Sequence, residues 1–166
     1  GPRSCVLACA RKATRQVSVK VVATEGGCGG TRAEARAACE VISDTVVRGF
    51  DVQDREPAFS GMARVGEFDE RGELLPARSA AAVRPRDLSE ALRWVRDIAR
   101  GLHDAHLRNV FHRDLKPRNV LVTPISRRAR IVDFGLAVSG RATERQNTIA
   151  GTPNYMAPEL ASGSAL

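Results

Sequence analysis

Hydrophobic residues recur along the chain in two kinds of pattern, one typical of strands and the other of a helix. Residues 17–22 form a short run rich in β-branched side chains, which favours a strand. Residues 46–52 and 57–65 have the same character and predict two more strands. Between the first two of these strands, residues 31–42 are rich in Ala, Glu and Arg, which predicts a helix. The first part of the chain is therefore expected to be rich in strands.

The clearest helical pattern begins near Asp87, after a stretch of turn-forming residues from 66 to 76. Asp87 and Glu90 have the spacing of a capping box, which marks a helix start. Apolar residues then recur at helical intervals. They are Leu88, Ala91, Leu92, Val95, Ile98, Ala99 and Leu102. Three short apolar segments follow, separated by polar ones, so the last part of the chain is expected to consist mainly of loops.

Charge adds little to this picture. The chain of 166 residues has 26 basic and 19 acidic side chains and a net charge of +7. Such a surplus attracts nucleic acid or anionic membranes. However, the arginines are scattered, apart from a short cluster at Arg127, Arg128 and Arg130, and no nucleic-acid-binding module is recognisable. We therefore expect a solvated surface and no nucleic-acid partner.

Two further observations bear on localisation. No stretch approaches the roughly 20 apolar residues of a membrane helix, and no secretory signal opens the chain. The four cysteines, Cys5, Cys9, Cys28 and Cys39, lack the paired spacing of metal ligands. Reduced thiols and a cytoplasmic location are expected.

The motifs that carry chemistry lie after the predicted long helix. Residues 112–119 read His-Arg-Asp-Leu-Lys-Pro-Arg-Asn, and Asp133-Phe134-Gly135 and Ala157-Pro158-Glu159 follow in that order. This series resembles the eukaryotic-type (Hanks-type) serine/threonine protein kinases. The composition, rich in Arg and Ala, resembles their bacterial members.

The resemblance implies an α+β, protein-kinase-like fold with two lobes. Residues 1–65 would form a truncated, β-rich N-lobe with the hinge. Residues 66–166 would form a partial helical C-lobe with the catalytic loop and activation segment. The implied activity is transfer of the γ-phosphoryl group of ATP to Ser or Thr hydroxyls of protein substrates.

The resemblance also assigns roles to individual residues. Asp114 would orient the attacking hydroxyl, and Lys116 would reach the γ-phosphate. Asn119 and Asp133 would hold Mg²⁺, a hard cation that prefers oxygen ligands. Lys116 is typical of serine/threonine kinases, and residues 151–159 resemble their substrate-docking segment.

Upstream, residues 17–20 read Val-Ser-Val-Lys and resemble the strand whose lysine contacts the α- and β-phosphates of ATP. Lys20 is one of only three lysines in the chain, and two of the three fall at catalytic positions of the family. Its expected ion-pair partner is Glu34, with Glu40 as the alternative.

Two more predictions concern the hinge and regulation. Met62 resembles a gatekeeper, and Ala63 to Val65 resemble the hinge that bonds adenine through its backbone; a plain core methionine is the alternative. Thr148 lies between the two downstream motifs, where a phosphate would be held by Arg113.

The chain departs from the family pattern near both ends. Counting back from Lys20 places Ser4 where the family has the third glycine of its phosphate-binding loop, with the first glycine beyond the start of the chain. The chain also stops soon after Glu159, so we expect a kinase domain truncated at both ends. The alternatives are a nucleotide-binding pseudokinase, an inactive fragment and, last, a basic nucleic-acid-binding protein.

Overall fold

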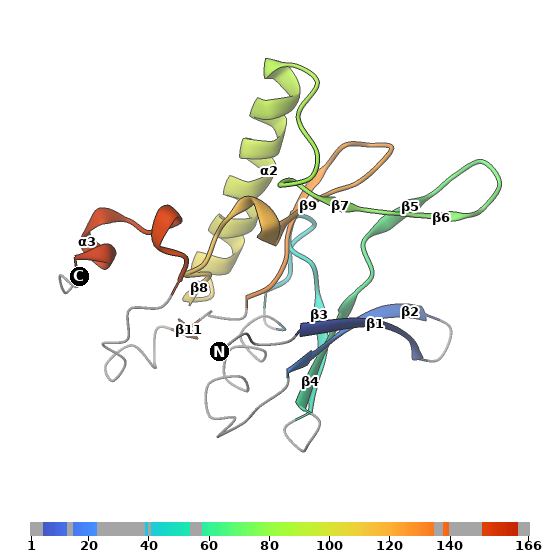
Figure 1. The fold of residues 1–166 in the computed structure, drawn as a ribbon, viewed down its shortest axis with the longest axis horizontal. Helices are drawn as coiled ribbons and strands as arrows, with labels where there is room; N and C mark the ends of the chain where they lie inside the picture. Colours follow the sequence, from blue (N-terminus) through green and yellow to red (C-terminus); the bar gives the residue numbers. More distant parts are fainter. Residues whose placement is uncertain are drawn as a thin grey trace.

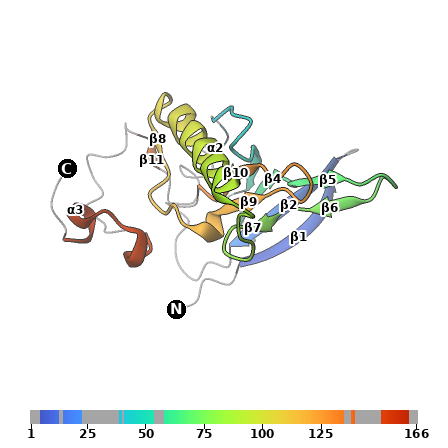
Figure 2. The same ribbon diagram turned by 90° about the horizontal axis from the view of Figure 1, so that it is seen from above.

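The structure, a computed structural model, describes residues 5–12, 15–22, 39, 41–53, 58–134, 138–139 and 151–162. A four-stranded sheet lies on one side of the long helix α2 (Leu88–His106), and the short helix α3 (Pro158–Ala161) lies on the other side (Figures 1 and 2). The described part is thus α+β, as the sequence predicts. None of its helices is both long and apolar enough to span a membrane.

The four-stranded sheet contains β1 (Cys5–Lys12), β2 (Arg15–Val22), β3 (Gly49–Gln53) and β4 (Ala58–Ala63). Its strand order is β1-β2-β4-β3, and all neighbours are antiparallel. The predicted strands near residues 17–22 and 57–65 are confirmed as β2 and β4. The first strand, β1, has no counterpart among the predicted elements.

The remaining N-terminal predictions are confirmed only in part. The predicted strand of residues 46–52 corresponds to β3, which begins at Gly49, whereas Val46 forms an isolated parallel bridge with Ile131. The Val47 N–H donates to the Ile131 carbonyl at 2.8 Å, which secures this connection. Of the predicted helix over residues 31–42, the structure describes Cys39 as helical and residues 41–42 as irregular, so the helix ends earlier than predicted.

The long helix α2 confirms the strongest pattern in the sequence. The carboxylate of its N-cap, Asp87, accepts a hydrogen bond from the Glu90 N–H at 2.7 Å. The Glu90 carboxylate reaches back to the N–H of Arg86, one residue before the cap, instead of that of Asp87. The capping-box spacing therefore predicts the helix start but not the second hydrogen bond.

The face that α2 buries differs from the predicted apolar stripe. Leu88, Leu92 and Val95 are 75%, 60% and 63% exposed, whereas Asp97 is fully buried. The Arg128 guanidinium bonds both oxygens of Asp97, at 2.7 and 3.0 Å. Burial raises the pKa of Asp97, but the hydrogen bonds from Arg128 and from a backbone N–H outweigh it, so the pKa lies below its usual value. A paired carboxylate thus lies on the buried face of α2, at a position outside the predicted apolar stripe.

Gly101 sets how closely α2 approaches the rest of the core. A Cβ at Gly101 would lie 2.9 Å from Thr45 Oγ1 and 3.0 Å from Ile131 Cδ1, so the helix packs directly on these residues. Around this contact the buried cluster consists of Val41, Val46, Ala105, Val110, Ile131 and Phe134.

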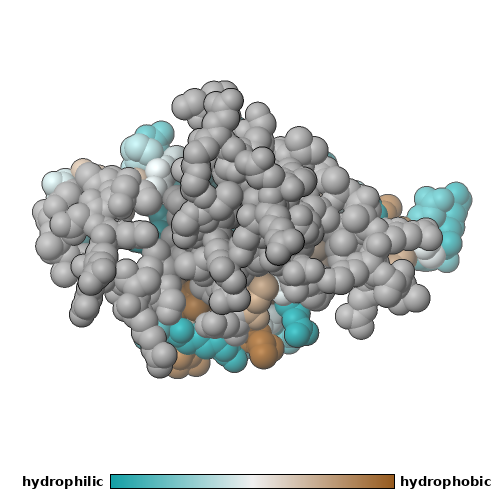
Figure 3. Space-filling model, turned by 90° about the horizontal axis from the view of Figure 1, so that it is seen from below, coloured by the Kyte–Doolittle hydropathy of each residue, from teal (hydrophilic) through white to brown (hydrophobic). Residues whose placement is uncertain are grey.

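The segment after β4 forms a hairpin from β5 (Gly66–Phe68) and β6 (Leu74–Pro76) where the sequence suggested only turns. Asp69 Oδ1 accepts hydrogen bonds from the Arg71 and Glu73 N–H groups, which closes the turn. The tip of the hairpin is hydrophilic and projects from the rest of the described part (Figures 1 and 3).

Short strands and helical turns complete the described part. The strand β7 (Arg78–Ser79) joins β9 (Val120–Val122) and β10 (Ala129–Ile131) in a sheet of order β10-β9-β7. The strand β8 (Val110–Phe111) pairs with β11 (Val138–Ser139). Two 3₁₀ turns, η1 (Pro117–Asn119) and η3 (Pro153–Tyr155), flank the loop that carries the candidate site.

Candidate active site

His112 anchors the loop between β8 and η1. Its side chain is buried, and its ring lies 4.7 Å from that of Phe134. The Asp114 N–H donates to His112 Nδ1 at 3.3 Å, so Nε2 carries the proton and donates to the Val132 carbonyl at 3.1 Å. Burial lowers the pKa of His112, and the hydrogen bond to Val132 offsets this only in part. A neutral imidazole therefore fixes the start of the loop to the strand that leads to Asp133.

Two non-glycine residues beside the site have left-handed backbones. Arg113 has φ 61° and Asp133 has φ 62°. Such conformations cost free energy and persist where the surroundings determine them. Gly151 is part of the surroundings of Arg113, because a Cβ at Gly151 would lie 2.9 Å from the Arg113 carbonyl oxygen. The segment beginning at Gly151 is therefore packed directly onto the loop.

Asp114 lies at the centre of a hydrogen-bonded cluster. Its Oδ2 accepts from Lys116 Nζ at 2.6 Å, and its Oδ1 accepts from the Thr152 hydroxyl at 2.6 Å. Burial raises the pKa of Asp114, but the hydrogen bonds from Lys116 and Thr152 outweigh it and hold the pKa below its usual value. Asp114 is thus an ionised carboxylate, and 15% of its side chain is exposed to an incoming group.

Lys116 and Thr152 complete this cluster from two distant parts of the sequence. Lys116 Nζ donates to Thr152 Oγ1 at 2.7 Å as well as to Asp114. An ammonium has three N–H donors, so one remains for another acceptor. Sequence reasoning placed Thr152 only within a docking segment and missed its contact with Asp114. Its position in the run Gly-Thr-Pro was the available signal.

Asn119 and Asp133 are brought together by the backbone. The Val132 N–H donates to the Asn119 carbonyl at 2.9 Å, which sets Asp133 beside the end of η1. Asn119 Nδ2 donates to the Asp114 carbonyl at 2.8 Å. This hydrogen bond fixes the side-chain amide through its nitrogen. The amide oxygen Oδ1 takes no part in it, and an amide oxygen is a suitable ligand for a hard cation. The pair therefore fits a Mg²⁺ site on the chemistry of its oxygens.

The predicted hinge residues are bonded to the residue before β3 and to the residue between β6 and β7. Met62 packs against a buried cluster of Val47, Val65 and Val132, as a core methionine would. The Ala63 N–H donates to the Arg48 carbonyl at 2.9 Å, and the Val65 carbonyl accepts from the Ala77 N–H at 3.0 Å. The gatekeeper and adenine-binding roles stay predictions.

Several other predicted residues lie at the edge of the described part or outside it. Lys20 belongs to β2 and stands opposite Leu7 and Ser60 in the sheet, but its side chain is outside the description. Glu34, its alternative Glu40, and Thr148 lie outside the described residues. Their roles stay predictions.

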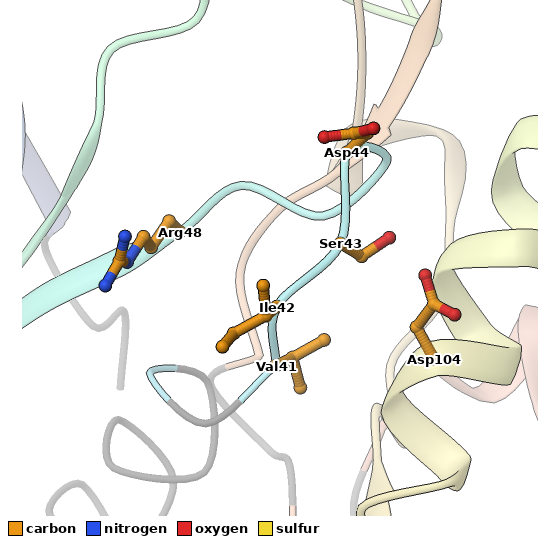
Figure 4. A pocket seen from close by; sticks show the side chains of 6 residues that line it. All are labelled: Val41, Ile42, Ser43, Asp44, Arg48 and Asp104. Carbon is orange, nitrogen blue, oxygen red and sulfur yellow. The ribbon is translucent and has the colours of Figure 1, made fainter.

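A hollow of about 500 Å³ lies between residues 41–48 and α2 (Figure 4). Its lining includes Ile42, Arg48 and the carboxylates of Asp44 and Asp104, and none of the catalytic-loop residues. It is therefore distinct from the cluster around Asp114.

Comparison with known proteins identifies the family that this loop geometry suggests. The family model of the protein kinase domain matches residues 1–166, which is the whole chain. The chain belongs to the protein kinase family. The two-lobed fold class and the serine/threonine type of the sequence motifs agree with this membership.

Characterised relatives of this kinase chain are serine/threonine-protein kinases. A probable serine/threonine-protein kinase of Saccharomyces cerevisiae, HSL1, is 33% identical over 125 residues, 75% of this chain and 8% of that protein. PknD of Mycobacterium tuberculosis is 44% identical over 94 residues, 55% of this chain and 12% of PknD. Kinase 17A of Oryctolagus cuniculus is 37% identical over 105 residues, 62% of this chain and 26% of that protein. The chain thus spans no more than about a quarter of these relatives.

Proposed function

We propose that this chain is a serine/threonine protein kinase that transfers the γ-phosphoryl group of ATP to Ser or Thr hydroxyls of protein substrates. The observation that carries the proposal is the cluster in which Asp114 accepts hydrogen bonds from both Lys116 and Thr152. Phosphoryl transfer depends mainly on positioning and on charge stabilisation. This cluster supplies a fixed carboxylate and a fixed cation within one hydrogen bond of each other.

Asp114 has the properties needed to orient an acceptor hydroxyl. A carboxylate has about four lone-pair sites, and the two short bonds leave room for another donor. Its lowered pKa keeps it ionised at neutral pH, so it accepts the hydroxyl hydrogen bond in its charged form. Lys116 has an N–H left to contact a phosphate oxygen, since two are engaged by Asp114 and Thr152.

ATP and Mg²⁺ are the proposed cofactors. Asn119 and Asp133 would hold Mg²⁺, which when bound neutralises charge on the phosphates. Lys20, paired with Glu34, would contact the α- and β-phosphates. Adenine would bond to the backbone between Ala63 and Val65, beside Met62. The Val65 N–H supports this, because it has no hydrogen bond among the described residues.

We further propose that the kinase acts in the cytoplasm and is regulated by phosphorylation at Thr148. Arg113 has no ion pair with any residue that the structure describes, and it precedes Asp114 directly. A phosphothreonine bound by its guanidinium would hold the segment that begins at Gly151 against the loop.

The deciding experiment is mass-spectrometric detection of autophosphorylation with ATP and Mg²⁺, using the Asp114→Asn variant as the control. Asn is nearly isosteric but cannot accept the hydroxyl proton as a charged group. Phosphate on Ser or Thr in the wild-type chain, reduced about 10²–10⁴-fold in the variant, supports the proposal. Equal labelling of the two proteins, or none in the wild type, contradicts it.

A further inference from the structure

Strand β7 connects the predicted hinge to the candidate active site. On one side, the N–H of Ala77, the residue before β7, donates to the Val65 carbonyl at 3.0 Å. On the other side, β7 pairs with β9, the strand that directly follows η1. The N–H of Ala80, the residue after β7, donates to the Val120 carbonyl at 2.8 Å. The strand therefore lies between the segment proposed to bond adenine and the turn proposed to hold phosphate and metal.

One side chain of β7 reaches η1 itself. Ser79 is half-buried, and its Oγ donates to the Pro117 carbonyl at 3.0 Å. The same oxygen accepts a hydrogen bond from the Ala81 N–H at 3.1 Å. A hydroxyl has one O–H and two lone pairs, so the bond from Ala81 occupies a lone pair and leaves the O–H for Pro117. The hydroxyl is thus held from both sides, between the end of β7 and the first residue of η1.

The carbonyl that Ser79 holds lies between two residues of the site. Lys116, which bonds Asp114, directly precedes Pro117, and Asn119 follows Pro117 by two residues. The Asn119 N–H donates to the Lys116 carbonyl at 2.8 Å, so one tight turn carries both side chains. Hydrogen bonds in 3₁₀ turns have poorer geometry than those in α-helices, so such a turn depends on contacts from outside. A displacement of its first carbonyl would therefore move Lys116 and Asn119 together.

We propose that Ser79 is a positioning residue for phosphoryl transfer, which holds η1 so that Lys116 and Asn119 keep the places they need for the γ-phosphate and Mg²⁺. This inference rests on the proposed kinase function and adds a residue that acts through the backbone of the turn. Side chains that hold metal ligands in place typically contribute about 10–100-fold to metal affinity or activity. Loss of the Ser79 hydroxyl should therefore weaken metal binding and lower kcat, each by about tenfold.

The test compares Ser79→Ala with two further variants. Ser79→Thr keeps the hydroxyl and should retain the wild-type values. Glu67→Ala removes a carboxylate that bonds the Ile125 and Ser126 N–H groups in the turn after β9. This variant loosens the same neighbourhood without removing a bond to η1, so it is the control for a loss that is merely structural.

Metal affinity is measured by electron paramagnetic resonance titration of Mn²⁺, a spectroscopic substitute for Mg²⁺, in the presence of a non-hydrolysable ATP analogue. Ser79→Ala should raise the dissociation constant of Mn²⁺ about tenfold, whereas Ser79→Thr and Glu67→Ala should leave it unchanged. An unchanged constant in Ser79→Ala, or equal weakening in Glu67→Ala, overturns the proposal.

Two further measurements separate this inference from the function on which it rests. Phosphorylation of a Ser peptide with a wild-type kcat in Ser79→Ala overturns the positioning role and leaves the kinase function standing. Absence of phosphorylation in the wild-type chain overturns the function. The exchange rate of the Asn119 N–H, measured by NMR without nucleotide, then decides the inference. About tenfold faster exchange in Ser79→Ala, the effect of one lost hydrogen bond, supports it, and an equal rate overturns it.

Discussion

The candidate catalytic loop of residues 112–119 and the hinge segment, residues 62–79 with the predicted hinge at its start, are held in place in different ways. In the loop, side chains bond to side chains: Lys116 and Thr152 bond Asp114. In the hinge segment, most of the contacts join backbone groups, as where the Val65 carbonyl accepts from the Ala77 N–H, and the Asp69 side chain closes the hairpin turn. Both regions abut β9, through η1 in one case and β7 in the other.

This difference explains why the loop could be predicted from the sequence and the structure of the hinge segment could not. A hydroxyl, an ammonium and a carboxylate at fixed distances require particular residue types, so the loop has a motif. Backbone pairing is satisfied by many side chains, so the hairpin of residues 66–76 has no comparable signature. Side-chain changes should therefore damage the loop, and backbone changes should damage the hinge segment.

Among the changes that test this difference, the largest effect is expected for Lys116→Met. Methionine keeps most of the volume of the side chain but removes the cation that bonds Asp114 and Thr152. Peptide kcat should fall about 10²-fold, the usual cost of losing one fixed charge-stabilising donor. Arg100→Met, which removes a cation from the exposed face of α2, should leave kcat near the wild-type value in the same assay. Equal kcat values for the two variants would mean that the loop tolerates side-chain changes after all.

A smaller effect, on stability, should separate two changes in the hinge segment. Ala77→Pro removes the N–H that bonds the Val65 carbonyl and should lower the free energy of unfolding by about 1–3 kcal/mol. Phe68→Ser changes a side chain that is 69% exposed, and the free energy of unfolding should change by no more than about 0.5 kcal/mol. Urea denaturation of both variants measures the two values. The comparison fails if the serine variant is the less stable of the two.

The smallest effect concerns pH. Burial lowers the pKa of His112 in the folded chain. At a pH between the folded and unfolded pKa values, this histidine therefore binds a proton in the unfolded chain but not in the folded one. This contribution to stability is fully present above the unfolded pKa of about 6.5 and is lost progressively as the pH falls below it. The lowered pKa of Asp114 acts in the same direction, but only below about pH 4.

Thermal melts between pH 8 and 5 should therefore show a Tm that falls with pH. The fall should be shallower in His112→Gln, which keeps a donor for the Val132 carbonyl but has no proton to gain. His106→Gln, a change at an exposed histidine of α2, is the matched control and should retain the wild-type slope. A wild-type slope in His112→Gln would assign the pH dependence to another group.

The sequence predicted the α+β class, α2 and the strands β2, β3 and β4, because each depends on a local pattern. It also singled out Asp114, Lys116, Asn119 and Asp133, which the structure brings together. It did not predict which face of α2 is buried, since Asp97 is made acceptable there by Arg128, about thirty positions away. Nor did it predict that Val46 would pair with Ile131, because a parallel bridge between distant segments has no local pattern.

The close contact at Gly101 has a mechanical consequence. The helix α2, the connection through Thr45 and Val46, and Ile131 of β10 meet there with no space for a single added carbon. The connection leads on to β3 of the four-stranded sheet, and β10 leads to Asp133 two residues later. If the sheet rotates relative to α2 during a catalytic cycle, the contact at Gly101 is the pivot of the rotation. Asp133 follows Ile131, which forms part of this contact, by two residues. The residue proposed to hold the metal would then keep its place while the outer strands of the sheet travel furthest.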